Sequence, residues 1–126
     1  METNIPEIMA EVTGAFQAYE AALTTNDVTT LDALFWTSDH VIRYGATDNL
    51  HGHDQILAFR QSRPSRGLER KLRNTVITTF GRDFATANTE FTRPTDQRIG
   101  RQSHSWARLG EGWRIVAAHV SWMDET

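Results

Sequence analysis

The hydrophobic pattern of this 126-residue chain changes its period near Lys71, and this change constrains the fold more than any other feature. Before Lys71, apolar residues recur at spacings of three and four, which is the pattern of amphipathic helices. After Lys71, apolar and polar residues alternate over four long stretches, as they do in strands. Helices in the first part and strands in the second predict the α+β class.

Two helices are expected at the start of the chain. Pro6 suits the first turn of a helix, with Asn4 as its candidate cap, and the helix should end near residues 24–26. Asp27 can then cap a short second helix. The apolar face of the first helix consists of Ile8, Val12, Phe16, Tyr19 and Leu23. The apolar positions of the second are Leu31, Leu34 and Phe35.

The middle of the chain predicts a short strand pair and a third helix. Residues 41–45 are rich in β-branched and aromatic side chains, and residues 50–52 return from a turn. Residues 53–60 have a helical pattern with Asp54 near its cap, and residues 62–67 form a loop.

Four long strands complete the expected fold. They are predicted at residues 72–80, 84–93, 99–109 and 113–123, with turns at 81–83, 94–98 and 110–112. A curved antiparallel sheet with N-terminal helices packed on one face makes a cone with a mouth. The length fits a single domain over residues 1–126.

Composition excludes several classes of protein. The chain has no cysteine, which excludes disulfide scaffolds, thiolate zinc sites and cysteine nucleophiles. It has no long apolar run and no apolar segment behind its first residues, so we expect no membrane span, no signal peptide and a cytoplasmic location. The sequence also has no G-x-S-x-G elbow, phosphate-binding loop or dinucleotide fingerprint.

Basic residues are concentrated in the second half of the chain. Residues 1–59 contain nine acidic residues and one basic residue, Arg43, whereas residues 60–126 contain eleven arginines and Lys71. These bases are spread along the predicted strands with no basic helix and no aromatic recognition motif, so nucleic-acid binding is not expected. Because arginine pairs well with carboxylates, they fit either a salt-bridged sheet surface or a small anionic ligand.

The order of elements resembles the nuclear transport factor 2-like (SnoaL-like) superfamily, whose fold is the cystatin-like cone, over essentially the whole chain. Three segments also resemble the AtzH/HpxZ-like family: VIRYG at 41–45, RPSRGL at 63–68, and the last hairpin, with GRQS at 100–103 and WRIVAAHVS at 113–121. That family is associated with cyanuric acid and oxalurate catabolism, and its assigned activity is the hydrolytic decarboxylation of 1,3-dicarboxyurea to allophanate. The resemblance therefore implies an amidohydrolase that needs no cofactor.

Arg43 and Tyr19 are the candidate catalytic residues. Arg43 lies inside an apolar strand pattern, where it either pairs with Asp39, Asp48 or a glutamate of the first helix, or lies inside the cone and clamps a carboxylate. Tyr19 is either a core tyrosine or a proton donor in the cavity. The resemblance carries an active-site arginine onto Arg43 and a catalytic tyrosine onto Tyr19.

Glu90, Gln102 and His104 are the candidate substrate-binding residues. If Gln102 and Trp106 face the cavity, His104 does so too, because strand residues two apart share a face. Glu90 and His104 would then provide an acid or base beside Arg43. Alternatively, both belong to a solvated, salt-bridged sheet face. Which residues of the last strand face inward stays open.

Metal binding is not expected. His51 and His53 form an H-x-H pair next to Asp54, but no third ligand follows at a spacing typical of metal sites.

Three functions are compatible with these features. The first is an enzyme acting on a small anionic N-carboxylated urea. The second is a non-catalytic module that binds small carboxylates or oligomerises, and the third, least favoured, is an enzyme like ketosteroid isomerase. We also expect a homodimer or a dimer-based homo-oligomer, because three short helices cannot bury all of Trp106, Trp113 and Trp122.

Overall fold

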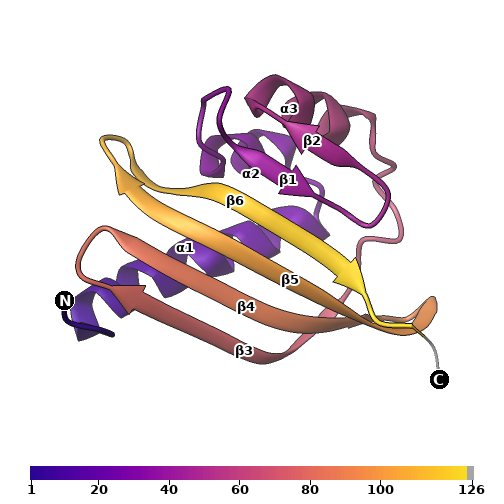
Figure 1. The fold of residues 1–126 in the computed structure, drawn as a ribbon. Helices are drawn as coiled ribbons and strands as arrows, with labels where there is room; N and C mark the ends of the chain where they lie inside the picture. The colour runs from indigo at the N-terminus through magenta and orange to yellow at the C-terminus, as the bar shows by residue number, and fades with distance from the viewer. Residues whose placement is uncertain (125–126) are drawn as a thin grey trace.

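The computed structural model describes residues 1–124, in which three helices pack against one six-stranded sheet (Figure 1). The helices are α1 (Pro6–Thr24), α2 (Val28–Leu34) and α3 (His53–Ser62). The strands are β1 (Ile42–Tyr44), β2 (Asn49–His51), β3 (Lys71–Phe80), β4 (Phe84–Arg93), β5 (Asp96–Leu109) and β6 (Gly112–Trp122). The α+β prediction is confirmed, and the elements follow the expected order. None of the helices within residues 1–124 is both long and apolar enough to cross a membrane.

The apolar face of α1 is buried against the sheet, and all five residues of the predicted face belong to it. The expected cap is wrong: Ile5 precedes the first turn, and no side chain among residues 1–124 caps it. Asn4 instead accepts a hydrogen bond from the backbone N–H of Thr79 at 3.0 Å, which ties the start of the chain to β3. Asp27 does cap α2, since it accepts from the backbone N–H of Thr30 at 3.2 Å.

The sheet is open and contains one parallel pair. Its strand order is β2-β1-β6-β5-β4-β3, so β2 and β3 are the edge strands and the curved sheet does not close. The predicted antiparallel arrangement is confirmed for the four long strands and the β1–β2 hairpin, and β1 in addition runs parallel to β6. The reason is that the short β1–β2 hairpin joins the sheet along the free side of β6. Figure 1 shows α1 crossing one face of the four long strands, with α2 and α3 beside the β1–β2 end.

A bulge in β6 decides which residues of the last strand face α1. Trp113 and Ile115 are buried on the α1 side. Val116 is then skipped in the pairing with β5, so the inward positions move by one residue. Val120 and Trp122 therefore lie on the inner side, where they line a cavity.

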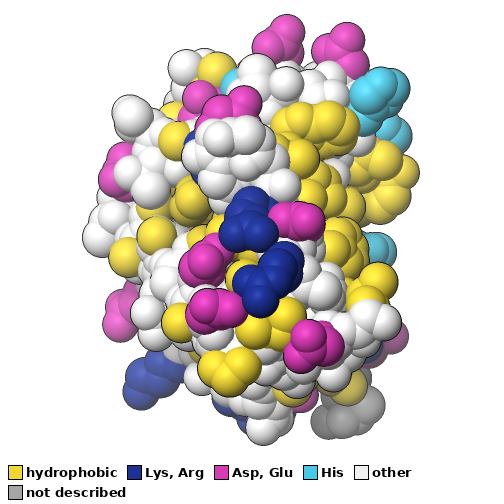
Figure 2. All heavy atoms as spheres, turned by 90° about the vertical axis from the view of Figure 1, so that its left-hand side faces the viewer, with side chains coloured by type: hydrophobic (Ala, Val, Ile, Leu, Met, Phe, Trp, Pro, Cys, Tyr) yellow, Lys and Arg dark blue, Asp and Glu magenta, His cyan; other side chains and the backbone are white. Residues whose placement is uncertain are grey.

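Opposite charges lie side by side at the end of the sheet that carries the β3–β4 and β5–β6 turns (Figure 2). Arg82 contacts Glu7 at 3.1 Å, and Arg108 contacts Asp83 at 3.0 Å and Glu11 at 3.6 Å. For these arginines the salt-bridged surface is the correct alternative. Exposed pairs of this kind contribute little to stability, about 0–1 kcal/mol each.

Trp106 and Trp113 are buried within the single chain, whereas Trp122 remains partly exposed. As expected, the single chain does not bury all three of these tryptophans. The homo-oligomer stays a prediction.

Gly100 on β5 pairs with Phe91 on β4, and a Cβ at Gly100 would overlap the Phe91 ring. That ring cannot move freely, since its centroid lies 5.2 Å from the ring of Trp122 and 4.5 Å from the Arg70 guanidinium. Gly100→Ala is therefore expected to lower the free energy of unfolding by about 1–3 kcal/mol in denaturant titrations. Gly110→Ala is the control, because a Cβ there meets no atom of the described residues within 4 Å. Equal unfolding midpoints for the two variants would contradict the overlap.

Candidate active site

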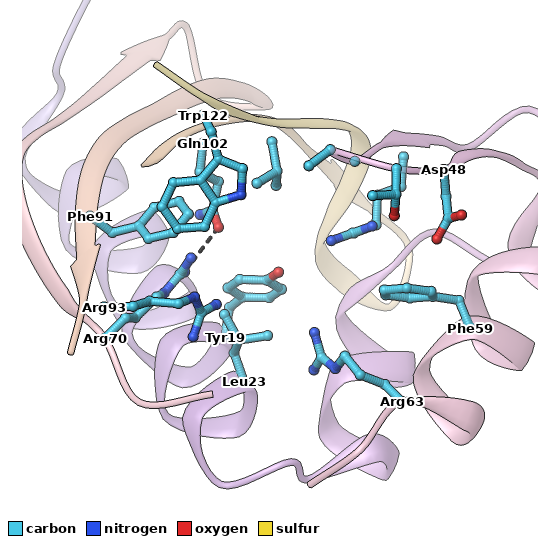
Figure 3. A pocket seen from close by; sticks show the side chains of 15 residues that line it. Tyr19, Leu23, Asp48, Phe59, Arg63, Arg70, Phe91, Arg93, Gln102 and Trp122 are labelled. Atoms are coloured by element: carbon cyan, nitrogen blue, oxygen red, sulfur yellow. Dashed lines mark hydrogen bonds between the residues drawn. The ribbon is translucent and has the colours of Figure 1, made fainter. Parts of the chain in front are cut away.

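A cavity of about 170 Å³ opens between α1, the β1–β2 turn, the end of α3 and the inner side of β4–β6 (Figure 3). Its walls combine four arginines with aromatic and small side chains and one carboxylate. The lining residues are Tyr19, Leu23, Arg43, Gly45, Ala46, Thr47, Asp48, Phe59, Arg63, Arg70, Phe91, Arg93, Gln102, Val120 and Trp122. Such a small, strongly cationic space suits a small anion.

Tyr19 forms the floor of this cavity because it lies on the buried face of α1. Its ring packs edge-on against His104 with the centroids 4.6 Å apart, and its hydroxyl accepts a hydrogen bond from Arg60 Nη2 at 3.0 Å. Burial alone would raise the pKa of Tyr19. The nearby charges of Arg60, Arg43 and Arg70 outweigh burial and hold that pKa below its usual value of 10.0. The phenol is therefore a stronger acid than a solvated tyrosine.

Arg43 points inward from β1, opposite to its neighbours along the strand, and is 8% exposed. Its guanidinium lies 4.6 Å from the centroid of the Phe59 ring. No carboxylate within residues 1–124 forms an ion pair with it, although Asp48 lines the same cavity. Burial and the charge of Arg60 lower the pKa of Arg43 to about 10, so the group stays charged at neutral pH. Gly45 leaves room for it, since a Cβ there would lie 2.8 Å from Arg43 Nη1.

Three further arginines, which were not predicted as site residues from the sequence, line the cavity. Figure 3 shows Arg70 and Arg93 on one side of Tyr19 and Arg63 on the other. Arg70 is bound by Glu20, with Nη2–Oε1 at 2.6 Å and Nε–Oε2 at 2.9 Å. Arg63 and Arg93 have no carboxylate partner within residues 1–124. Burial and the charge of Arg60 lower the pKa of Arg63 to about 10. Burial and the charge of Arg70 lower the pKa of Arg93.

Comparison with known proteins assigns the chain to a family. Residues 1–126, the entire chain, match the AtzH-like family. The chain belongs to this family. The resemblance noted in the sequence is thereby confirmed.

Solved structures of relatives agree with the AtzH-like assignment. A Pectobacterium atrosepticum protein of unknown function is 57% identical with a TM-score of 0.96, covering 97% of this chain and 95% of its own. A cystatin-like fold protein from Burkholderia xenovorans is 47% identical with a TM-score of 0.96, covering 100% and 99%. A Streptomyces avermitilis protein of the NTF2-like family, provisionally named as a dehydratase, is 17% identical with a TM-score of 0.79, covering 94% and 98%. It shares the fold alone. No protein in the curated set matches this chain.

Gln102 lines the cavity of this AtzH-like protein, as predicted, whereas His104 does not line it. Gln102 is 1% exposed, and its Oε1 accepts from Arg70 Nη2 at 2.9 Å. His104 faces inward on the same strand but lies behind the Tyr19 ring, 2% exposed. Burial and the charges of Arg70, Arg60 and Arg43 hold its pKa well below 6.5. His104 is therefore neutral, and its expected contact with substrate is corrected to a contact with Tyr19.

The placement of Glu90 in the cavity is wrong. Glu90 lies on the outer side of β4 and pairs with Arg73 at 3.0 Å and with Asn74 at 3.2 Å. Its neighbours Thr89 and Phe91 are buried, so the alternation of the strand turns Glu90 outward. The salt-bridged sheet face is the correct alternative for this residue.

The histidine pair near β2 does not assemble ligands for a metal. His51 contacts the Tyr44 ring at 5.7 Å between centroids, whereas His53 Nε2 lies 2.7 Å from Asp32 Oδ1. Within residues 1–124, no group of three histidine, aspartate or glutamate side chains is placed to hold a metal ion.

Proposed function

We propose that this AtzH-like protein is a decarboxylating amidohydrolase that converts 1,3-dicarboxyurea to allophanate. The observation that carries the proposal is the convergence of four arginines and one acidified phenol on a single small cavity. Of the cavity arginines, only Arg70 is bound by a carboxylate within residues 1–124. The remaining positive charge favours a ligand with more than one negative group, and 1,3-dicarboxyurea carries a carboxylate at each end.

Arg43 supplies the orienting charge in this mechanism. Its uncommitted guanidinium can bind one substrate carboxylate through two parallel hydrogen bonds. Arg63, Arg70 and Arg93 hold the carboxylate at the other end of the substrate. Fixing both ends of this short molecule places one of its two nitrogens over Tyr19, and such orientation alone accelerates reactions.

Tyr19 supplies the proton. The bond between the substrate nitrogen and its carboxylate carbon breaks, the electron pair goes to the nitrogen, and the nitrogen takes the proton of Tyr19 as carbon dioxide leaves. Tyr19 then recovers a proton from water, and the hydroxide combines with carbon dioxide as bicarbonate. One dianionic dicarboxyurea and one water thus become one allophanate and one bicarbonate, with charge balanced.

The test is turnover by the purified protein. Freshly prepared 1,3-dicarboxyurea is mixed with the protein, and carbon dioxide and allophanate are followed against the spontaneous rate. We expect both products at equal rates, well above the rate without protein. If malonate or dicarboxyurea raises Tm but no turnover occurs, the proposed enzymatic activity is contradicted. That result would favour a non-catalytic module that binds small carboxylates through the same arginines.

A further inference from the structure

Arg60, on the last turn of α3, is a buried cation without an anionic partner among residues 1–124. It is 1% exposed, and no carboxylate within residues 1–124 forms an ion pair with it. Its Nη2 donates to Tyr19 Oη at 3.0 Å, while its Nε and Nη1 have no hydrogen-bond partner among the described residues. The guanidinium carbon lies 5.6 Å and 5.7 Å from the ring centroids of Phe35 and Phe59.

Such a group is expensive to bury. Removing a cation from water costs several kcal/mol, whereas contact with aromatic faces returns about 0.5–2 kcal/mol per ring. An apolar side chain of similar length would fill the space without that cost. The presence of Arg60 is therefore best explained by a negative charge that forms next to it, and the oxygen it binds is that of Tyr19.

The other charged groups around Tyr19 reinforce this charge. Arg43 on β1, Arg63 after α3, Arg70 before β3 and Arg93 on β4 all act on the phenol. The neutral His104 of β5 contacts its ring. Two carboxylates lie nearby, Glu20 on Arg70 and Asp48 at the cavity wall. Cations outnumber carboxylates, so a phenolate is stabilised at this position.

We propose that Arg60 is the positioning residue for Tyr19: its hydrogen bond aims the phenol proton into the cavity, and its charge stabilises the phenolate that remains after the proton is donated. The direction follows from the bond itself. Because Tyr19 Oη accepts from Arg60, its own proton must point elsewhere, and Figure 3 shows the hydroxyl directed into the cavity. The destination of the proton rests on the proposed function, whereas the ionisation of the phenol does not.

The chain contains only two tyrosines, which makes the phenol directly measurable. In a Tyr44→Phe protein, Tyr19 is the sole tyrosine, and ultraviolet absorbance titration without substrate gives its pKa. We expect a value below 10. Arg60→Met in the same background should raise it by about one unit or more, a tenfold change in the ionisation constant, and Arg60→Lys should raise it less. Arg108→Met, which removes a cation at the turn end of the sheet, is the matched control and should leave it unchanged.

Activity provides the second readout. Proton donation requires the protonated phenol, so kcat/KM falls as pH rises through the pKa of Tyr19. Arg60→Met should lower kcat with little change in KM and shift this alkaline limb to higher pH by the amount seen in the titration. A purely structural role would lower Tm without moving either curve.

Two results would overturn the proposal. One is a Tyr19 pKa at or above 10 in the Tyr44→Phe protein, which requires no Arg60 variant. The other is an unchanged pKa in both folded Arg60 variants. If the wild-type protein releases no carbon dioxide, the proposed function fails, but the titration still decides whether Arg60 controls the phenol.

Discussion

Tyr19→Phe is expected to reduce kcat for carbon dioxide release from 1,3-dicarboxyurea by about 10²–10⁴-fold, the usual contribution of a positioned general acid. Phenylalanine keeps the ring and its edge-on contact with His104, so the cavity retains its shape. KM should change little, because the arginines that bind the carboxylates are untouched. The measurement is a steady-state assay of both products.

The variant also removes the only hydrogen-bond acceptor of Arg60 within residues 1–124. Leaving that buried cation unpaired should lower stability by about 1–3 kcal/mol, so Tm must be recorded with the rates. Tyr44→Phe and Glu90→Gln are the controls, since Tyr44 points away from the cavity and Glu90 lies on the outer face. Wild-type kcat in folded Tyr19→Phe would remove Tyr19 from the mechanism.

Much of the fold follows from local patterns. The helical spacing of α1, the cap at Asp27 and the places of the turns after β3 and β5 could be predicted from the sequence, because each depends on residues close in sequence. The turn expected at 94–98 is shorter, since β5 begins at Asp96. Two features depend on contacts between distant residues and could not be predicted from the sequence. These are the parallel pairing of β1 with β6 and the bulge at Val116, which turns Val120 and Trp122 into the cavity.

Part of the missed site had a visible signal. Arg60 follows Ile56 by four residues, which places both on one face of α3, and both are buried. On β4, Ala85, Ala87 and Phe91 share one side, and the same alternation turns Arg93 inward and Glu90 outward. An arginine at the next position of a buried apolar face therefore indicates a side chain that points into the fold.

Arg63 and Arg70 had no such signal. Both lie in the connection between α3 and β3, where no periodicity applies. Their position in the cavity depends on how that connection packs against the rest of the fold. Glu20 of α1, which binds Arg70, is one of the contacts that hold it. Contacts between segments fifty residues apart are set by the packed structure and cannot be read from spacing.

Arg43→Met is expected to lower kcat/KM by about 30- to 5,000-fold, since breaking one charge-assisted pair in a buried site costs roughly 2–5 kcal/mol. Methionine keeps the length and the contact with Phe59 but cannot bind a carboxylate. Stability should move the other way. Burial and the charge of Arg60 lower the pKa of Arg43, so the folded state disfavours its charge, and removing it should hold or raise Tm at neutral pH.

A fall in kcat/KM without a fall in Tm would separate a binding role of Arg43 from a structural one. Arg43→Lys restores the charge without the two-pronged geometry and should recover only part of kcat/KM. Malonate should raise Tm of the wild-type protein more than that of Arg43→Met, because the lost anion contact weakens binding to the folded state. A variant that loses stability while it retains wild-type kcat/KM would show that Arg43 supports the fold and that the substrate is held by other arginines of the cavity.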